Sequence, residues 1–183
     1  MSPRYALSYD KDILNEIAVG LVLHLDPDAL EREGGKYTCA PDFRVQGQHF
    51  FLCVAVNGGM SRWLPLYTNL REGRQLLDQK AKKGHPKWLQ GQHCWYGAQV
   101  WEASAKAIYL AAARGHDKTR KGNRNTIAPE GVPDIDEVAW RWYDKSRMDS
   151  SNAFASVRAP CVNGLLLQTA PKQRFSPSSE LQP

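Results

Sequence analysis

The chain has 183 residues, of which 42% are hydrophobic, and it carries a formal net charge of +5. A chain of this length and composition forms one folded core with extensions, and no stretch reaches the roughly 18 apolar residues that are needed to span a membrane. Residues 1–5 also lack the apolar run of a signal peptide, so we expect a cytoplasmic protein that does not act at a membrane.

The cysteines lie far apart and show no spacing of the kind that binds zinc. They are Cys39, Cys53, Cys94 and Cys161. In a reducing compartment such cysteines are most simply free thiols, some of them buried like small apolar residues. The sequence therefore predicts no metal and no other cofactor.

The first predicted elements are a short helix, a strand and a long loop. An apolar stripe predicts a helix over 10–17. Residues 20–27 predict the first strand, because this run is rich in Leu and Val and bounded by Gly and Pro. The next stretch, 28–45, has two adjacent glycines and scattered charges, so we expect a loop with an irregular strand at 37–40.

Two further strands and a tight turn follow. Residues 47–56 predict a strand that is apolar on both faces, and such a strand lies in the centre of a sheet. Residues 63–68 predict the next strand. Asn57, Gly58 and Gly59 between them tolerate positive φ, so the two strands are expected to form an antiparallel hairpin.

The middle of the chain is expected to contain a basic helix, a strand and an alanine-rich helix. Residues 72–82 predict the basic helix, and residues 84–86 end it. Alternating side chains predict a strand over 92–101. The apolar stripe of 103–114 predicts the next helix, with Gly115 as its C-cap.

The pattern weakens after this helix. Residues 116–132 are polar and basic and predict a loop, and residues 133–148 predict a second amphipathic helix. A strand at 162–167 is expected next, and the polar stretch 176–183 predicts a disordered tail.

Positive charges gather in two stretches of the chain. These stretches contain Arg71, Arg74, Lys80, Lys82, Lys83 and Lys87 in the first and Arg114, Lys118, Arg120, Lys121 and Arg124 in the second. Clustered cations release counterions when they meet a phosphate backbone, and nearby aromatic side chains such as Trp88 can stack on unpaired bases. The plainer alternative is a solvated basic loop beside a tryptophan-rich core.

His49 opens the second predicted strand, and Thr68 closes the third. The start of one strand lies beside the end of the next in an antiparallel hairpin, so we expect the two side chains to meet at one rim of the sheet. The alternative is that His49 is a structural residue and Thr68 bonds its own backbone in a turn. His93 is the second candidate for a catalytic histidine.

The order of these elements resembles that of the PemK/MazF-like toxins of bacterial type II toxin–antitoxin systems. Gly20–Pro27 resembles the opening strand of that family, Phe50–Val56 the second strand and Trp63–Thr68 the third, whereas Ala98–Val100 is similar to a later Asp-Gln-Val element. The resemblance covers residues 18–113. It implies a small SH3-like β-barrel, usually homodimeric, that cleaves single-stranded RNA without a metal and is neutralised by an antitoxin protein.

One position departs from the family pattern. The family has Arg-Pro at the head of the second strand, where this chain has His49 and Phe50, whereas the catalytic Ser or Thr of the family is matched by Thr68. The departure is consistent with an inactive enzyme, a changed mechanism or a different alignment. For an active enzyme we predict that His49 is the general acid or base and that Thr68 binds the scissile phosphate, with Arg62 or Arg71 as the nearest cation.

The expected fold is mainly β with flanking helices, namely a small SH3-like barrel over 18–115 with a helical lead-in at 1–17, a helical extension at 116–170 and a disordered tail at 171–183. The predicted RNA-binding residues are Arg62, Arg71, Arg74, Lys82, Lys83, Lys87, Trp88 and Gln99. The expected function is a growth-inhibiting endoribonuclease. The alternative is a non-catalytic module on the same barrel that binds nucleic acid or protein.

Overall fold

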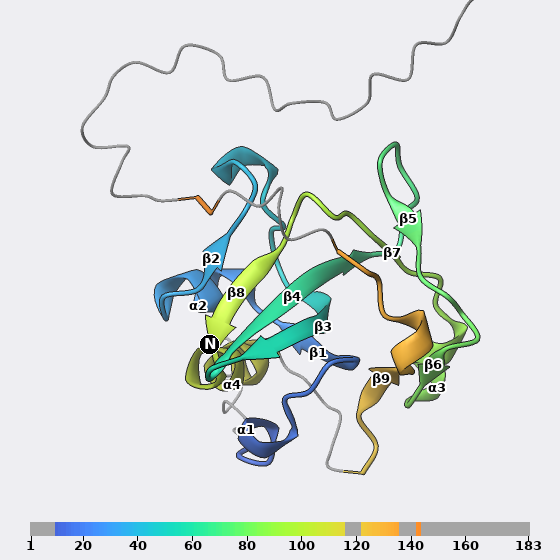
Figure 1. The fold of residues 1–183 in the computed structure, drawn as a ribbon, viewed down its shortest axis with the longest axis horizontal. Helices are drawn as coiled ribbons and strands as arrows, with labels where there is room; N and C mark the ends of the chain where they lie inside the picture. Colours follow the sequence, from blue (N-terminus) through green and yellow to red (C-terminus); the bar gives the residue numbers. More distant parts are fainter. Residues whose placement is uncertain (1–9, 116–121, 136–141, 144–183) are drawn as a thin grey trace, which may run out of the picture. The chain divides into compact units, whose positions relative to one another are not determined.

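The computed structural model describes residues 10–115, 122–135 and 142–143, and its main element is one antiparallel sheet (Figure 1). The strands are β1 (Leu21–Leu25), β2 (Lys36–Tyr37), β3 (His49–Asn57), β4 (Met60–Tyr67), β5 (Gln75–Leu76), β6 (Lys82–Lys83), β7 (Cys94–Trp95), β8 (Trp101–Ser104) and β9 (Asn125–Ile127). They pair in the order β2-β8-β4-β3-β1-β9-β6, and β7 joins β5 to β4. The order does not return to its start, so the sheet is open.

Short helices accompany the sheet. They are α1 (Ile13–Glu16), α2 (Pro27–Arg32), α3 (Pro86–Gln90) and α4 (Ala105–Arg114), with 3-10 turns at Pro41–Phe43 and Pro129–Gly131. None of the helices in the described ranges is long and apolar enough to cross a membrane. The expectation of a mainly β fold with flanking helices is confirmed. All described residues belong to one compact unit within 1–146.

The β3–β4 hairpin is the centre of the sheet and confirms the predicted pair of strands. Gly58 and Gly59 have φ of 56° and 83°, in the left-handed region that a tight hairpin turn requires. From the turn, Asn57 pairs with Met60, but the register shifts between Cys53 and Ala55. This β-bulge moves every later pair of the hairpin by one residue.

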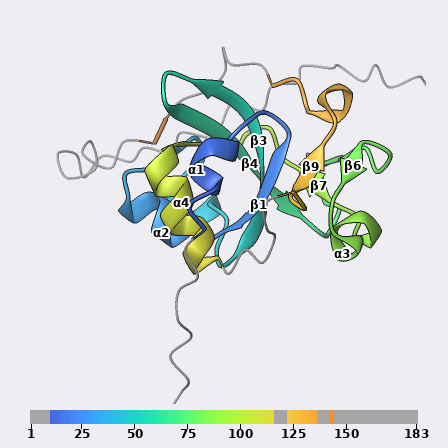
Figure 2. The ribbon, with the colours of Figure 1, turned by 90° about the horizontal axis from the view of Figure 1, so that it is seen from below.

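The two faces of the sheet each cover a hydrophobic core, because successive side chains of a strand point to opposite faces. On one face, Leu23, Phe51 and Trp63 are fully buried with apolar residues of α2 and α4. On the other face, Leu52 packs in a cluster with Trp88 of α3. Figure 2 shows α1, α2 and α4 on one side of the central strands and α3, β6 and β9 on the other.

Helix α4 confirms the alanine-rich helix that the sequence predicts. The Ser104 side chain accepts a hydrogen bond from the Ala107 backbone N–H at 3.2 Å, which caps the first turn. Gly115 ends the helix directly against β1, where an added Cβ atom would lie 2.1 Å from the His24 carbonyl oxygen. Only a residue without a side chain lets the helix end approach the strand this closely.

The predicted basic helix over 72–82 is wrong. The segment instead supplies β5, which pairs with β7, and β6, which pairs with β9. Gly73 has φ of 77°, which does not fit a helix. Of the two leucines in the segment, Leu77 is buried and Leu76 is exposed. The break at 84–86 is real, but α3 begins there, with the His85 ring accepting from the Lys87 backbone N–H at 3.2 Å.

The structure corrects three other expectations. The strand over 92–101 is divided into β7 and β8 by a turn in which the Gln99 N–H donates to the Tyr96 carbonyl at 3.0 Å. The loop over 28–45 contains α2, whose N-cap is Asp26 followed by Pro27. Within 116–132 the structure places β9, paired with β1.

The expectations for the rest of the chain lie mostly outside the described residues. Of the predicted helix over 133–148, residues 133–135 are not helical, and most of the remainder is not described. The predicted strand at 162–167 and the tail at 171–183 also lie beyond the described ranges. The predicted helix over 10–17 is confirmed in its centre, as α1.

Arg124 connects the two ends of the described fold. Its guanidinium lies 2.6 Å from an Asp10 carboxylate oxygen and 2.7 Å from a Glu16 carboxylate oxygen, and its side chain is only 6% exposed. Arg124 belongs to the second predicted cluster of cations, but its charge is neutralised inside the protein. The residue therefore serves the fold rather than a ligand.

Candidate nucleic-acid interface

His49 lies at the end of the central hairpin, as the sequence predicts, but beside a different partner. The register pairs Phe50 with Leu66, so His49 continues the ladder opposite Tyr67. The two rings make an edge-to-face contact with their centroids 5.7 Å apart. His49 is half-buried at this rim and also pairs with Leu25 of β1.

Thr68 is exposed and follows the last residue of β4. Without the β-bulge, the count from the turn would place Thr68 opposite His49, as expected from the sequence. The bulge shifts the register by one residue, so Tyr67 takes that position and Thr68 falls on the alternate side. The structure thus brings Thr68 to the same rim as His49 but not into the predicted pair.

Arg74 brings a positive charge to the same rim. Its guanidinium lies 3.6 Å from the centroid of the Tyr67 ring, in cation–π contact. One of its nitrogens donates to the Asn69 backbone carbonyl at 3.0 Å and to the Asn69 side-chain oxygen at 2.5 Å. These bonds hold the segment after β4 in a compact loop that returns Arg74 to Tyr67 and His49.

Burial lowers the pKa of His49, and the nearby charges of His24 and Arg74 lower it further, against a hydrogen bond to the Gly47 backbone. The Nδ1 atom lies 3.3 Å from the Gly47 carbonyl oxygen. A carbonyl can only accept, so in the neutral ring Nδ1 carries the hydrogen and the lone pair lies on Nε2. Burial raises the pKa of Tyr67 to about 12, so its hydroxyl stays protonated at neutral pH.

Gln99 is buried behind this rim and connects it to the segment between β2 and β3. Its side-chain oxygen accepts a hydrogen bond from the Tyr67 hydroxyl, and its nitrogen donates to the Phe43 carbonyl at 2.7 Å and to the Cys39 sulfur at 3.0 Å. With 2% of its surface exposed, Gln99 has no face for direct contact with RNA. The predicted RNA contact is therefore corrected: Gln99 positions its neighbours.

The other predicted RNA-binding cations divide into exposed and paired residues. Arg71, Lys83 and Lys87 are exposed. Arg62 lies near the hairpin turn, at the opposite end of β4 from Tyr67, and its Nε atom is 3.1 Å from a Glu102 carboxylate oxygen. Arg62 is thus separated from His49 by the length of the strand.

Lys82 and Trp88 are buried, so neither is available to RNA. Trp88 is 1% exposed and Lys82 is 6% exposed. The Lys82 ammonium donates to the backbone carbonyls of Trp88, at 3.4 Å, and of Gly91, and lies 2.7 Å from Nδ1 of His93. It also lies 4.4 Å from the centroid of the Trp88 ring. These residues form an internal cluster on the α3 side of the sheet.

Burial sets the protonation of this internal cluster. It lowers the pKa of Lys82 to about 8. Burial and the positive charge of Lys82 lower the pKa of His93 to about 4. His93 is therefore neutral at pH 7 and accepts a hydrogen bond from the ammonium, so the second catalytic candidate of the sequence is engaged inside the fold.

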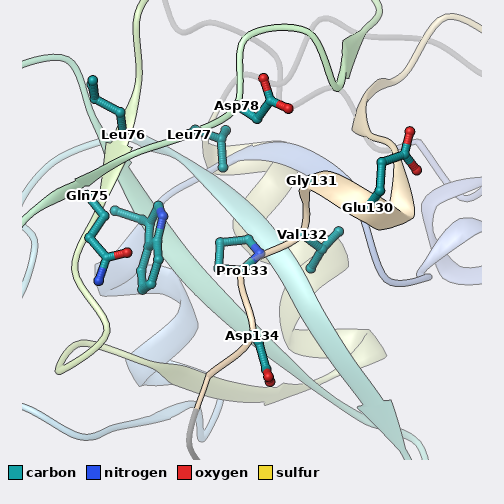
Figure 3. A pocket seen from close by; sticks show the side chains of 10 residues that line it. Gln75, Leu76, Leu77, Asp78, Glu130, Gly131, Val132, Pro133 and Asp134 are labelled. Carbon is teal, nitrogen blue, oxygen red and sulfur yellow. The ribbon is translucent and has the colours of Figure 1, made fainter.

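A hollow of about 340 Å³ lies between β5 and residues 130–134 (Figure 3). Its lining includes the carboxylate residues Asp78, Glu130 and Asp134, which Figure 3 shows on different sides of the hollow. The negative charge of these carboxylates would repel a phosphate group. In the part of the chain that the structure describes, no three His, Cys, Asp or Glu residues are grouped to hold a metal ion.

The sequence did not single out Phe43, and it offered Tyr67 and Tyr96 only as aromatic side chains near the basic stretches, without a place at this interface. Tyr67 was visible as the neighbour of Thr68, and only the bulge decides which of the two faces His49.

A scan against protein-family models, a search of curated proteins and a search of solved structures each found no match. Function must therefore be inferred from the chemistry of these residues.

Proposed function

We propose that the chain binds single-stranded RNA at the His49 rim, by which we mean the sheet edge that carries His49, Tyr67, Thr68 and Arg74. It cleaves the RNA there without a metal, in the manner of the PemK/MazF-like toxins. The observation that carries this proposal is the contact chain of His49, Tyr67 and Arg74, which sets a neutral imidazole near a guanidinium at an accessible strand end. RNA cleavage needs a proton acceptor and a cation at the phosphate, and this rim supplies both.

His49 is the general base in this mechanism. The lone pair on Nε2 takes the proton of a ribose 2′-hydroxyl, and the 2′-oxygen then attacks the adjacent phosphorus. A bond from the 2′-oxygen to phosphorus forms, the bond to the 5′-oxygen breaks, and the departing 5′-oxygen receives a proton from the imidazolium or from water. The products are a 2′,3′-cyclic phosphate and a free 5′-hydroxyl. The lowered pKa of His49 favours the base form at neutral pH.

Arg74 supplies the cation that stabilises the negative charge of the phosphorane. The PemK/MazF-like family has its arginine at the head of the second strand, where this chain has His49. Arg74 returns a guanidinium to that neighbourhood from the loop after β4. Thr68 and Arg71 are exposed next to it and hold the flanking phosphate oxygens.

The SH3-like fold belongs to the same proposal. It is supported by the long strand β4, which pairs with β8 along its first half and with β7 at its end, as a strand does where a sheet curls. The open order from β2 to β6 is the main departure from a closed barrel. A growth-inhibiting role, a cognate antitoxin protein and a homodimer follow from the resemblance alone.

The test is cleavage of single-stranded RNA by the full chain in the presence of EDTA, with the product ends identified. We expect cyclic phosphate ends and no cleavage where the 2′-hydroxyl is replaced by hydrogen. His49→Ala and Arg74→Ala should lose activity, whereas the matched controls His85→Asn and Arg32→Ala should keep it, because both lie outside the rim. Activity that survives His49→Ala would overturn the assignment.

Binding without cleavage is the second candidate function. It is favoured by the register, which leaves Thr68 out of the pair with His49 and places no carboxylic acid beside the imidazole among the described contacts. RNA affinity measured on the same protein separates the two functions. Tight binding with intact RNA would support the binding module, and growth arrest on expression that His49→Ala relieves would support the ribonuclease.

A further inference from the structure

Two aromatic side chains are exposed on the loops beside the His49 rim. Phe43 is 79% exposed and Tyr96 is 42% exposed, although both belong to loops that the buried Gln99 holds in place. Single exposed rings are common on protein surfaces, and these two differ in that their backbone is held in place beside the His49 rim.

The loop that carries Phe43 is held on both sides. The Phe43 carbonyl accepts from the Gln99 side chain at 2.7 Å, and its N–H donates to the Ala40 carbonyl at 2.9 Å. The next residue, Arg44, makes an ion pair with Asp28 at 2.7 Å. The ring of Phe43 is therefore presented to solvent by a backbone that needs little further ordering on binding.

Tyr96 lies against the loop that carries the exposed arginine. Its carbonyl accepts from the Gln99 backbone N–H at 3.0 Å. Its ring packs on Gly73, where an added Cβ atom would lie 3.1 Å from a ring carbon. Gly73 sits between Arg71 and Arg74, so Tyr96 adjoins the proposed phosphate contacts.

We propose that Phe43 and Tyr96 are stacking platforms for unpaired nucleobases of the RNA strand whose phosphates meet Arg71 and Arg74. This inference rests on the proposed function and assigns the base contacts of the same site. Single exposed rings interspersed with arginines match a single-stranded nucleic acid, which offers alternating bases and phosphates. A protein interface is also enriched in aromatic side chains and arginine, so the test below includes a protein contact as a separate outcome. Gln99 is then a positioning residue for both platforms.

The experiment is fluorescence titration of the full chain with short single-stranded RNAs that carry one 2-aminopurine, whose emission falls when the base stacks. Phe43→Ala is expected to weaken binding about 10-fold or more and to abolish the quenching at one position of the RNA. The dependence of affinity on salt should stay unchanged, since no cation is lost. Arg74→Ala should instead reduce the salt dependence by about one ion.

Control variants separate stacking from loss of structure. Leu14→Ala removes another exposed apolar side chain, at 42% exposure on α1, and should leave binding unchanged. Phe43→Trp should restore the quenching. Gln99→Glu keeps an acceptor for the Tyr67 hydroxyl but removes the donor to the Phe43 carbonyl, so it should reduce the quenching.

Each outcome decides the inference separately from the cleavage mechanism. Quenching by Phe43 in a protein that does not cleave RNA would support the platforms and overturn the ribonuclease. Cleavage and binding that Phe43→Ala leaves at the wild-type level would overturn the platforms and leave Phe43 as a contact for a protein. No binding of RNA by the wild-type chain would overturn both.

Discussion

His49 and His93 lie in similar chemical surroundings on opposite faces of one sheet. Each histidine contacts an aromatic ring and lies near a cation, Arg74 in the first case and Lys82 in the second. Burial lowers the pKa of both. His49, however, is half-buried at a strand end, whereas His93 is 4% exposed and already accepts from the Lys82 ammonium.

The difference shows that accessibility and unused bonding capacity, rather than residue type, separate a candidate site from a structural cluster. In the internal cluster the Lys82 ammonium donates to two backbone carbonyls and lies against His93, although the buried Trp88 Nε1 atom has no partner, so these bonds stabilise the packing of α3. At the rim, His49 keeps the lone pair on Nε2, and the cation is Arg74, which contacts the exposed Asn69. Variants can test each half of this comparison.

The largest expected effect is on cleavage through His49. His49→Ala should lower the cleavage rate by about 10²–10⁴-fold, because a positioned general base contributes roughly that factor. His93→Gln should leave the rate of the folded protein unchanged. The midpoint of the acidic limb of the wild-type pH–rate profile should lie below pH 6.5, since the pKa of His49 is lowered from that value. An equal loss of rate in both variants would end the distinction between the two histidines.

The second prediction concerns acid stability. His93 has a pKa of about 4 in the folded chain, against an ordinary value of 6.5. Between these values the unfolded chain binds a proton that the folded chain does not, so the free energy of unfolding falls as the pH falls. At about 1.4 kcal/mol per pKa unit, the loss between pH 7 and pH 4 should approach about 3 kcal/mol. Urea unfolding at several pH values measures it, and His93→Gln should flatten the dependence.

Lys82→Met should have a smaller effect on stability. The change removes the donor to His93 and to two carbonyls, and unpaired buried acceptors cost about 1–3 kcal/mol. In the wild type, stability should also rise between pH 8 and 10.5, because the unfolded lysine keeps a proton that the folded one releases. That rise should be absent from Lys82→Met, and its persistence would show that another group titrates there.

The smallest expected effect is at Arg62. Its ion pair with Glu102 is partly exposed, with side-chain exposures of 25% and 22%, so Arg62→Ala should cost less than about 1 kcal/mol. RNA affinity should stay the same, because Arg62 lies at the other end of β4 from the rim. Thermal unfolding and RNA titration check the two parts. A marked loss of affinity would extend the RNA path along the whole strand.

Local patterns in the sequence predicted the central elements well. The three main strands, the glycine turn and α4 depend on apolar runs and on residues with special backbone freedom, and these signals are short-range. The partner of His49 was missed because it depends on the β-bulge at Cys53 and Ala55, which shifts the register by one residue. No residue pattern in the strand announces that shift.

Charge was the least reliable guide to the site. Lys82 stands in a run of cations and predicts a surface residue, yet the carbonyls of α3 and the ring of His93 surround its ammonium. Trp88 was expected to stack on a base and instead fills the second core. Lys82 bonds to residues 6 to 11 positions further along the chain and Trp88 packs on Phe50 of β3, and only the tertiary structure reveals either contact.

The ion pairs of Arg124 have a consequence for the order in which the chain folds during synthesis. Asp10 leaves the ribosome 114 residues before its guanidinium partner. Strand β9, which follows Arg124 directly, pairs with β1 near the start of the sheet. The N-terminal helix and the edge of β1 must therefore wait, without these contacts, until nearly all of the described fold has been translated.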